Sequence, residues 1–113
     1  MKHTNFLRPL AVVLGLALGL PAQAGTYDIT VDKVRIDTGT FKKNGIGYNG
    51  SQTPTILRFQ EGEDVAIRVK NNLRESTSIH WHGLILPFQQ DGVPGISFNG
   101  IKAGETFTYR FPI

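Results

Sequence analysis

The chain has 113 residues and a net charge of +3, from 12 lysines and arginines, 9 aspartates and glutamates, and neutral histidines. It has no cysteine, which excludes a disulfide framework and any thiolate-bound metal site within these residues. The basic residues are scattered between acidic ones and form no stripe, so no nucleic-acid partner is expected.

The N-terminus has the three parts of a secretory signal peptide. Lys2 and Arg8 precede the apolar run PLAVVLGLALGL, and the small-residue tripeptide Ala-Gln-Ala follows at 22–24. We therefore predict a signal peptide over residues 1–24, export, and cleavage before Gly25. The apolar run is shorter than the about 20 residues that cross a bilayer, so no stable membrane anchor is expected after cleavage.

The first half of the remaining chain is typical of β-strands. Residues 26–31 alternate apolar and polar side chains, and residues 34–36 continue the alternation after a slip at Asp32 and Lys33 that suits a bulge or tight turn. The glycine-rich residues 37–53 are interpreted as a loop or a weak hairpin. Two strands are predicted at 55–59 and 65–70, separated by a turn that contains Gly62.

The second half continues the pattern, with a strand predicted at 77–86, a long turn-rich segment at 87–104 and a last strand at 105–113. No segment after Gly25 has a helical period. Several short strands joined by Gly/Pro turns predict an all-β sandwich or barrel.

The sequence IHWHG places two histidines on either side of the only tryptophan. In a strand, residues i and i+2 point to the same face with Cα atoms roughly 6.5–7 Å apart, so His80 and His82 share a face and Trp81 turns to the opposite one. Imidazole suits Cu, Zn, Fe and Ni, and the pair can chelate one ion or serve two ions of a cluster. Many such pairs are instead ordinary solvent-facing residues, and the spacing alone leaves these alternatives open.

Three features near the histidines favour a site. Gly83 leaves room for close approach of a backbone or ligand, and the apolar run LILPF at 84–88 is expected to exclude water. Asp91 follows in a turn, where its carboxylate is expected to orient a ligand or handle protons. An Asp-Gly pair that simply forms a turn is the alternative for Asp91.

The second half of the chain resembles a known family. SIHWHGLILPFQQDGVPGISFNGIKAGETFTYRFPI, residues 78–113, resembles the first copper-ligand block of multicopper oxidases and is most similar to their bacterial copper-resistance (CopA-type) branch. The preceding residues 48–78 also resemble the segment that leads into this block.

The resemblance implies a cupredoxin-like Greek-key β-barrel or sandwich in the periplasm, with copper as cofactor. It implies that His80 is a type 2 copper ligand, that His82 is a type 3 copper ligand, and that Asp91 helps deliver protons near the type 2 copper. The implied activity is substrate oxidation, of Cu(I) or a phenolic compound, coupled to reduction of O₂ to water.

The chain also departs from the family pattern. It lacks a second His-x-His block and the cysteine of the type 1 copper site, so we do not expect oxidase turnover by these residues alone. We interpret residues 25–113 as a cupredoxin domain truncated at its C-terminus, in the N-terminal fragment of an oxidase whose parent uses O₂ and a reductant. Three alternatives stay open: a stand-alone periplasmic module that sequesters copper, a zinc site in which Asp91 replaces a third histidine, and a purely structural β-domain.

Overall fold

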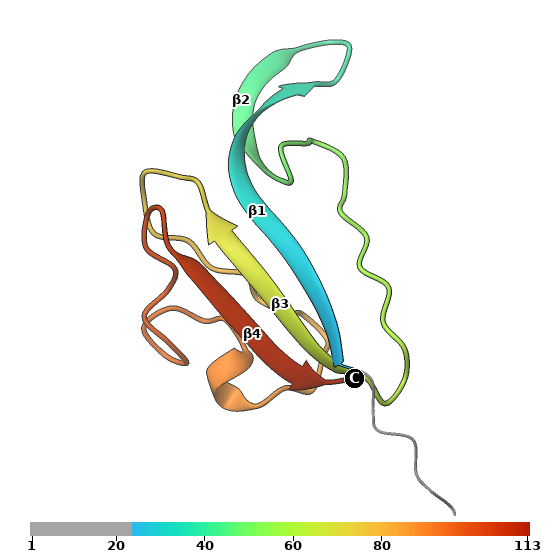
Figure 1. The fold of residues 1–113 in the computed structure, drawn as a ribbon. Helices are drawn as coiled ribbons and strands as arrows, with labels where there is room; N and C mark the ends of the chain where they lie inside the picture. Colours follow the sequence, from blue (N-terminus) through green and yellow to red (C-terminus); the bar gives the residue numbers. More distant parts are fainter. Residues whose placement is uncertain (1–23) are drawn as a thin grey trace, which may run out of the picture.

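The computed structural model describes residues 24–113, and the predicted signal peptide lies outside them except for Ala24. Four strands form one sheet: β1 (Ala24–Asp37), β2 (Lys42–Tyr48), β3 (Asp64–Asn71) and β4 (Thr106–Pro112), with one short 3₁₀ turn, η1 (Phe88–Gln90). Their order in the sheet is β2-β1-β3-β4 (Figure 1). The prediction of an all-β fold is confirmed, and the described residues include no helix long and apolar enough to cross a membrane.

The long strand β1 changes partner halfway along its length. Its first half runs parallel to β3 as far as the pair Val31–Asn71, and its second half runs antiparallel to β2. Buried positions shift from Ile29 and Val31 to Val34 across this point. The bulge or turn predicted at Asp32 and Lys33 is wrong, because the register with β2 continues unbroken; the slip instead marks the change of partner.

Two further expectations for the strands need correction. For residues 37–53 the hairpin alternative is confirmed and the loop alternative is wrong, because β2 pairs along its full length with the second half of β1. Residues 55–59 form no strand, although Leu57 and Phe59 pack against the core and Ile56 is 71% exposed. The alternation of a strand is present in this segment, but within residues 24–113 no neighbouring backbone pairs with it.

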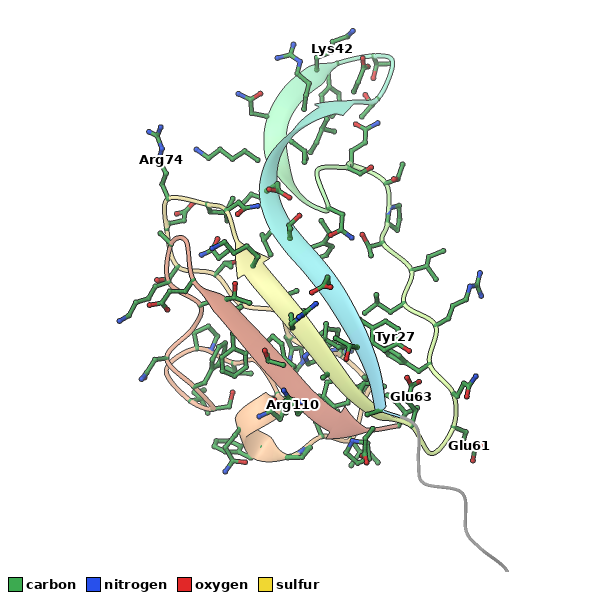
Figure 2. The ribbon with its side chains drawn as sticks, in the orientation of Figure 1. Tyr27, Lys42, Glu61, Glu63, Arg74 and Arg110 are labelled. Carbon is green, nitrogen blue, oxygen red and sulfur yellow. The ribbon has the colours of Figure 1, made fainter. Side chains whose placement is uncertain are left out.

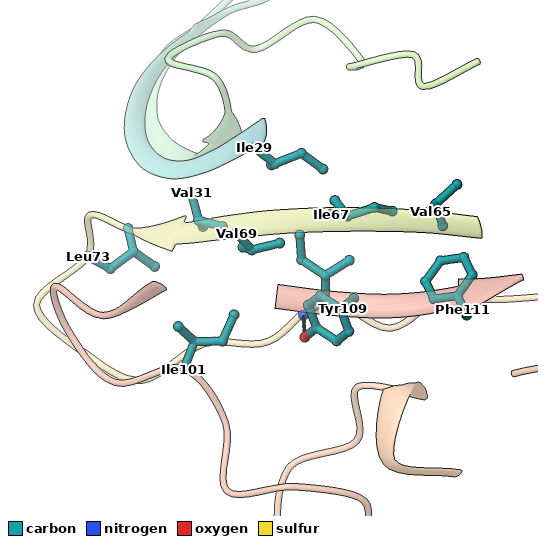
Figure 3. Close-up of a cluster of buried hydrophobic side chains, with 10 residues drawn as sticks. Ile29, Val31, Val65, Ile67, Val69, Leu73, Ile101, Tyr109 and Phe111 are labelled. Carbon is teal, nitrogen blue, oxygen red and sulfur yellow. Dashed lines mark hydrogen bonds between the residues drawn. The ribbon is translucent and has the colours of Figure 1, made fainter. Parts of the chain in front are cut away.

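The core lies on one face of β1, β3 and β4. Its buried side chains are Ile29 and Val31 from β1, Val65, Ile67 and Val69 from β3, Tyr109 and Phe111 from β4, and Leu73, Ile79 and Ile101 from the loops (Figure 3). The opposite face carries polar side chains, including an ion pair between Arg68 Nε and Asp28 Oδ1 at 2.7 Å. The sheet therefore has one apolar and one solvated face, as antiparallel and mixed sheets commonly do.

Polar contacts fasten the loops to the ends of the sheet. The fully buried Asn71 amide donates to the carbonyl oxygens of Glu75 and Ile101, at 2.8 and 2.9 Å, and its Oδ1 accepts from Leu73 N. At the other end, the Tyr27 hydroxyl donates to Glu63 Oε1 at 2.9 Å, and these two side chains lie together beside the start of β1 (Figure 2). These contacts hold the connecting segments in place around the core.

Candidate metal centre

The two histidines lie side by side on the surface of the segment that covers the core. Their ring centroids are 5.8 Å apart with an interplanar angle of 67°. Both residues are exposed, whereas Ile79 before them is buried and Trp81 between them is partly buried. The predicted strand at 77–86 is wrong in its hydrogen bonding, because only Thr77 forms a bridge, to Ile101. The predicted alternation of side chains is present over residues 79–82 but not beyond, since Ile85 is fully exposed and Leu86 packs against the core.

Aromatic packing on the core side anchors the segment that carries the two histidines. The Trp81 ring packs edge-to-face on Tyr109, with centroids 5.3 Å apart, and against Phe111 at 5.6 Å. The Tyr109 hydroxyl accepts a hydrogen bond from Ile79 N at 3.1 Å (Figure 3). Burial raises the pKa of the Tyr109 phenol, so the hydroxyl remains neutral and fixed in this role. Ile79 and Trp81 thus hold the backbone that carries both histidines.

The structure brings Asp91 next to His80, although 11 residues separate them. His80 Nδ1 lies 2.7 Å from the backbone carbonyl oxygen of Asp91 and 3.4 Å from its carboxylate Oδ1. A carbonyl oxygen only accepts hydrogen bonds, so Nδ1 of His80 is the donor. In the neutral ring this leaves the lone pair on Nε2, which is then able to bind a metal ion.

Sequence reasoning missed Gly92, which is buried directly after Asp91. The close backbone approach expected at Gly83 occurs here instead: a Cβ on Gly92 would lie 1.8 Å from Ile79 O, whereas one on Gly83 would meet nothing within 4 Å. The Asp-Gly pair was a sequence signal for a turn, but it did not show what the turn would contact.

The apolar run after the histidines is also placed differently from the expectation. Leu84, Ile85 and Phe88 are 42%, 101% and 59% exposed, so they do not exclude water from the histidines in this structure. Only Leu86 of this run packs against the core. Nothing within residues 24–113 covers the three exposed side chains.

The donor set fits copper as part of a larger site. Two imidazoles suit copper, but residues 24–113 contain no group of three His, Cys, Asp or Glu side chains able to enclose an ion. The zinc alternative required Asp91 as third ligand. The Asp91 carboxylate lies 3.4 Å from Nδ1 of His80, the nitrogen that already contacts the Asp91 carbonyl, so the structure does not support that alternative.

Comparison with known proteins identifies the family. The model of the multicopper oxidase family matches residues 28–113. Copper resistance protein A of Escherichia coli is 38% identical over 88% of this chain and 16% of its own length, and the copper resistance protein A homolog of Pseudomonas syringae pv. tomato is 42% identical over 77% and 15%. The chain thus spans about a sixth of the curated relatives it matches.

Solved structures agree. The multi-copper oxidase from Pseudomonas thermotolerans superimposes with a TM-score of 0.75 at 34% identity, over 80% of this chain and 22% of that one. The blue copper oxidase from Nitrosomonas europaea gives a TM-score of 0.76 at 31% identity, over 80% and 30%. The expected cupredoxin-like fold and copper as the metal are confirmed, and the chain belongs to the multicopper oxidase family.

Proposed function

We propose that this chain supplies the first two imidazole ligands of the copper cluster of a multicopper oxidase. His80 would bind the type 2 copper and His82 a type 3 copper. The observation that carries the proposal is the pair of exposed imidazoles 5.8 Å apart, one of which has its proton fixed on Nδ1 by a backbone carbonyl. The two histidines share a face, and no third ligand within residues 24–113 joins them around a single ion, so they suit two neighbouring ions of a cluster.

Each residue of the site has a distinct task. His80 would bind through Nε2, since its Nδ1 is occupied by the contact to the Asp91 carbonyl. The side chain of Asp91 is 37% exposed, so its carboxylate is open to exchange protons with water beside His80. Bound copper would supply the redox chemistry, in which electrons taken from a reductant reduce O₂ to water.

The remaining ligands would come from outside these residues. Leu84, Ile85 and Phe88 follow the histidines in the chain and are exposed, which fits a site that another module of the oxidase covers. Residues 25–113 would then be the first cupredoxin domain of an exported, periplasmic protein. The copper resistance relatives favour a role in copper tolerance, with Cu(I) or a phenolic compound as the reductant.

Copper titration tests the ligand assignment. The wild-type chain is titrated with Cu(II) by calorimetry and electron paramagnetic resonance, in parallel with His80→Ala, His82→Ala and His3→Ala. We expect nitrogen-ligated copper in the wild-type and His3→Ala proteins and its loss in the other two. The chain is titrated with residues 1–24 retained, so that His3, the only other histidine, serves as the matched control. Equal binding by all four proteins would refute the assignment.

A chimera separates an oxidase role from copper sequestration. Residues 25–113 replace the matching segment of the Escherichia coli relative, and O₂ consumption with Cu(I) is measured after copper loading. We expect turnover that His82→Ala abolishes. A chimera that binds its full complement of copper but consumes no O₂ would favour the sequestering module.

A further inference from the structure

The turn after η1 meets the histidine segment backbone to backbone, without a side chain between them. Gly92 has a φ of +75°, and a Cβ there would lie 1.8 Å from Ile79 O, 2.8 Å from Ile79 C and 3.2 Å from His80 Cα. Real Cβ atoms do not approach backbone this closely. Position 92 therefore accepts only glycine, for steric as well as conformational reasons.

This close approach decides which part of Asp91 reaches His80. The backbone carbonyl of Asp91 is within hydrogen-bonding distance of His80 Nδ1, at 2.7 Å, whereas the carboxylate oxygen is at 3.4 Å. A hydrogen bond of this kind is lost when its atoms separate beyond about 3.5 Å. Relieving a 1.8 Å contact requires a movement of more than about 1 Å, which is enough to break the bond.

The Ile79 segment and the η1 turn are each held in place by other hydrogen bonds. The strain of a residue larger than glycine at position 92 would therefore fall on the contact between His80 and the Asp91 carbonyl. Ile79 N donates to the Tyr109 hydroxyl at 3.1 Å. The η1 turn is tied to β4, because Arg110 N donates to Gln90 Oε1 at 2.8 Å. Asp91 N closes the same turn on Phe88 O at 3.2 Å.

We propose that Gly92 is a positioning residue for His80: its missing side chain lets the Asp91 backbone carbonyl, rather than the carboxylate, hold the proton on Nδ1 and leave Nε2 open to the metal. The tautomer follows from the contact between Nδ1 and the Asp91 carbonyl, and its consequence for copper rests on the proposed function. The Asp91 carboxylate is then not needed to orient the ligand and is left for proton exchange.

The tautomer is measured directly by long-range ¹⁵N–¹H NMR of histidine-labelled chain at mildly alkaline pH, where free imidazole is neutral. Wild type, Asp91→Ala, Gly92→Ala and Gly95→Ala are compared. Gly95→Ala is the matched control, because Gly95 lies in the same loop with a φ of +77° and a Cβ there would meet nothing within 4 Å. We expect the Nδ1–H form of His80 in all proteins except Gly92→Ala.

Two results would overturn the inference. One is a Gly92→Ala protein that keeps the Nδ1–H form, and the other is an Asp91→Ala protein that loses it, since the latter keeps the backbone carbonyl. If Gly92→Ala does not fold, Asp91→Ala still decides between carbonyl and carboxylate.

Cu(II) titration of the same proteins gives the second readout. We expect roughly 10- to 100-fold weaker affinity in Gly92→Ala and little change in Gly95→Ala, as for other residues that orient a metal-bound histidine. Undiminished affinity in Gly92→Ala would contradict the positioning role. If wild type binds no copper while the tautomers behave as expected, the proposed function fails and the tautomer inference stands.

Discussion

Replacing Tyr109 by phenylalanine tests whether the histidine segment is held by the core. The change removes only the hydroxyl oxygen, which accepts from Ile79 N at 3.1 Å, and keeps the ring that packs on Trp81. Tyr109 is 0% and Ile79 7% exposed, so water cannot replace the lost acceptor without local opening. The backbone N–H of Ile79 is then left buried without a partner.

The cost follows from that unpaired donor. A buried donor that loses its acceptor costs about 1–3 kcal/mol, and the burial of both residues places this one near the middle, at about 2 kcal/mol. For a domain of this size, that corresponds to a melting temperature lower by about 8–16 °C. Unfolding is followed by urea and heat with the fluorescence of Trp81, the only tryptophan, which packs directly on the altered ring.

Tyr48→Phe is the matched control, because it removes the same atom from a side chain that is 40% exposed. Its free energy of unfolding should stay within about 0.5 kcal/mol of wild type. Equal stabilities for wild type and Tyr109→Phe would refute the argument that this hydroxyl fixes the backbone beneath the metal site.

Three further outcomes follow from buried and charged groups. Asn71→Ala removes three hydrogen bonds from a fully buried amide and should lower the free energy of unfolding in urea by about 3 kcal/mol; a loss below about 1 kcal/mol would contradict this. Hydrogen bonds from Thr30 and Asn72 lower the pKa of Asp32. Its stabilising effect is therefore present above pH 3.8 and is lost as pH falls through the lowered value. Asp32→Asn should lose less free energy of unfolding than wild type when the pH is lowered over this range. Burial raises the pKa of Tyr109, so stability should fall as pH rises above 10.0, and Tyr109→Phe should lose less stability than wild type over that range.

Local patterns in the sequence predicted most side-chain directions correctly. The alternation in IHWH gave two exposed histidines with a core-facing tryptophan between them, although the segment forms only a single bridge. The same alternation placed Leu57 and Phe59 against the core in a segment without strand partners. Side-chain direction depends on backbone extension, which is local, whereas strand pairing depends on a neighbour that a local pattern does not specify.

The features that sequence reasoning missed depend on contacts between distant segments. The slip at Asp32 and Lys33 was visible, but the change of partner from β3 to β2 that causes it was not. Asp91 was expected near the histidines only as one alternative, because a turn residue gives no direction to its side chain. The carbonyl of Asp91 lies closer to His80 than its carboxylate does because Gly92 contacts the backbone of Ile79. The Asp-Gly pair is the only local sequence signal of this contact.

The geometry of the site therefore has two separate origins. The position of both rings comes from the core, because Ile79 and Trp81 are the buried neighbours that alternate with the histidines. The nitrogen that His80 offers comes from the loop, through the carbonyl that Gly92 allows to approach. Gly92→Ala should therefore change the tautomer of His80, whereas Tyr109→Phe, which acts on the core side, should leave the Nδ1–H form in place. A Tyr109→Phe protein that loses the Nδ1–H form would mean that the core, and not only the loop, fixes the nitrogen that His80 offers.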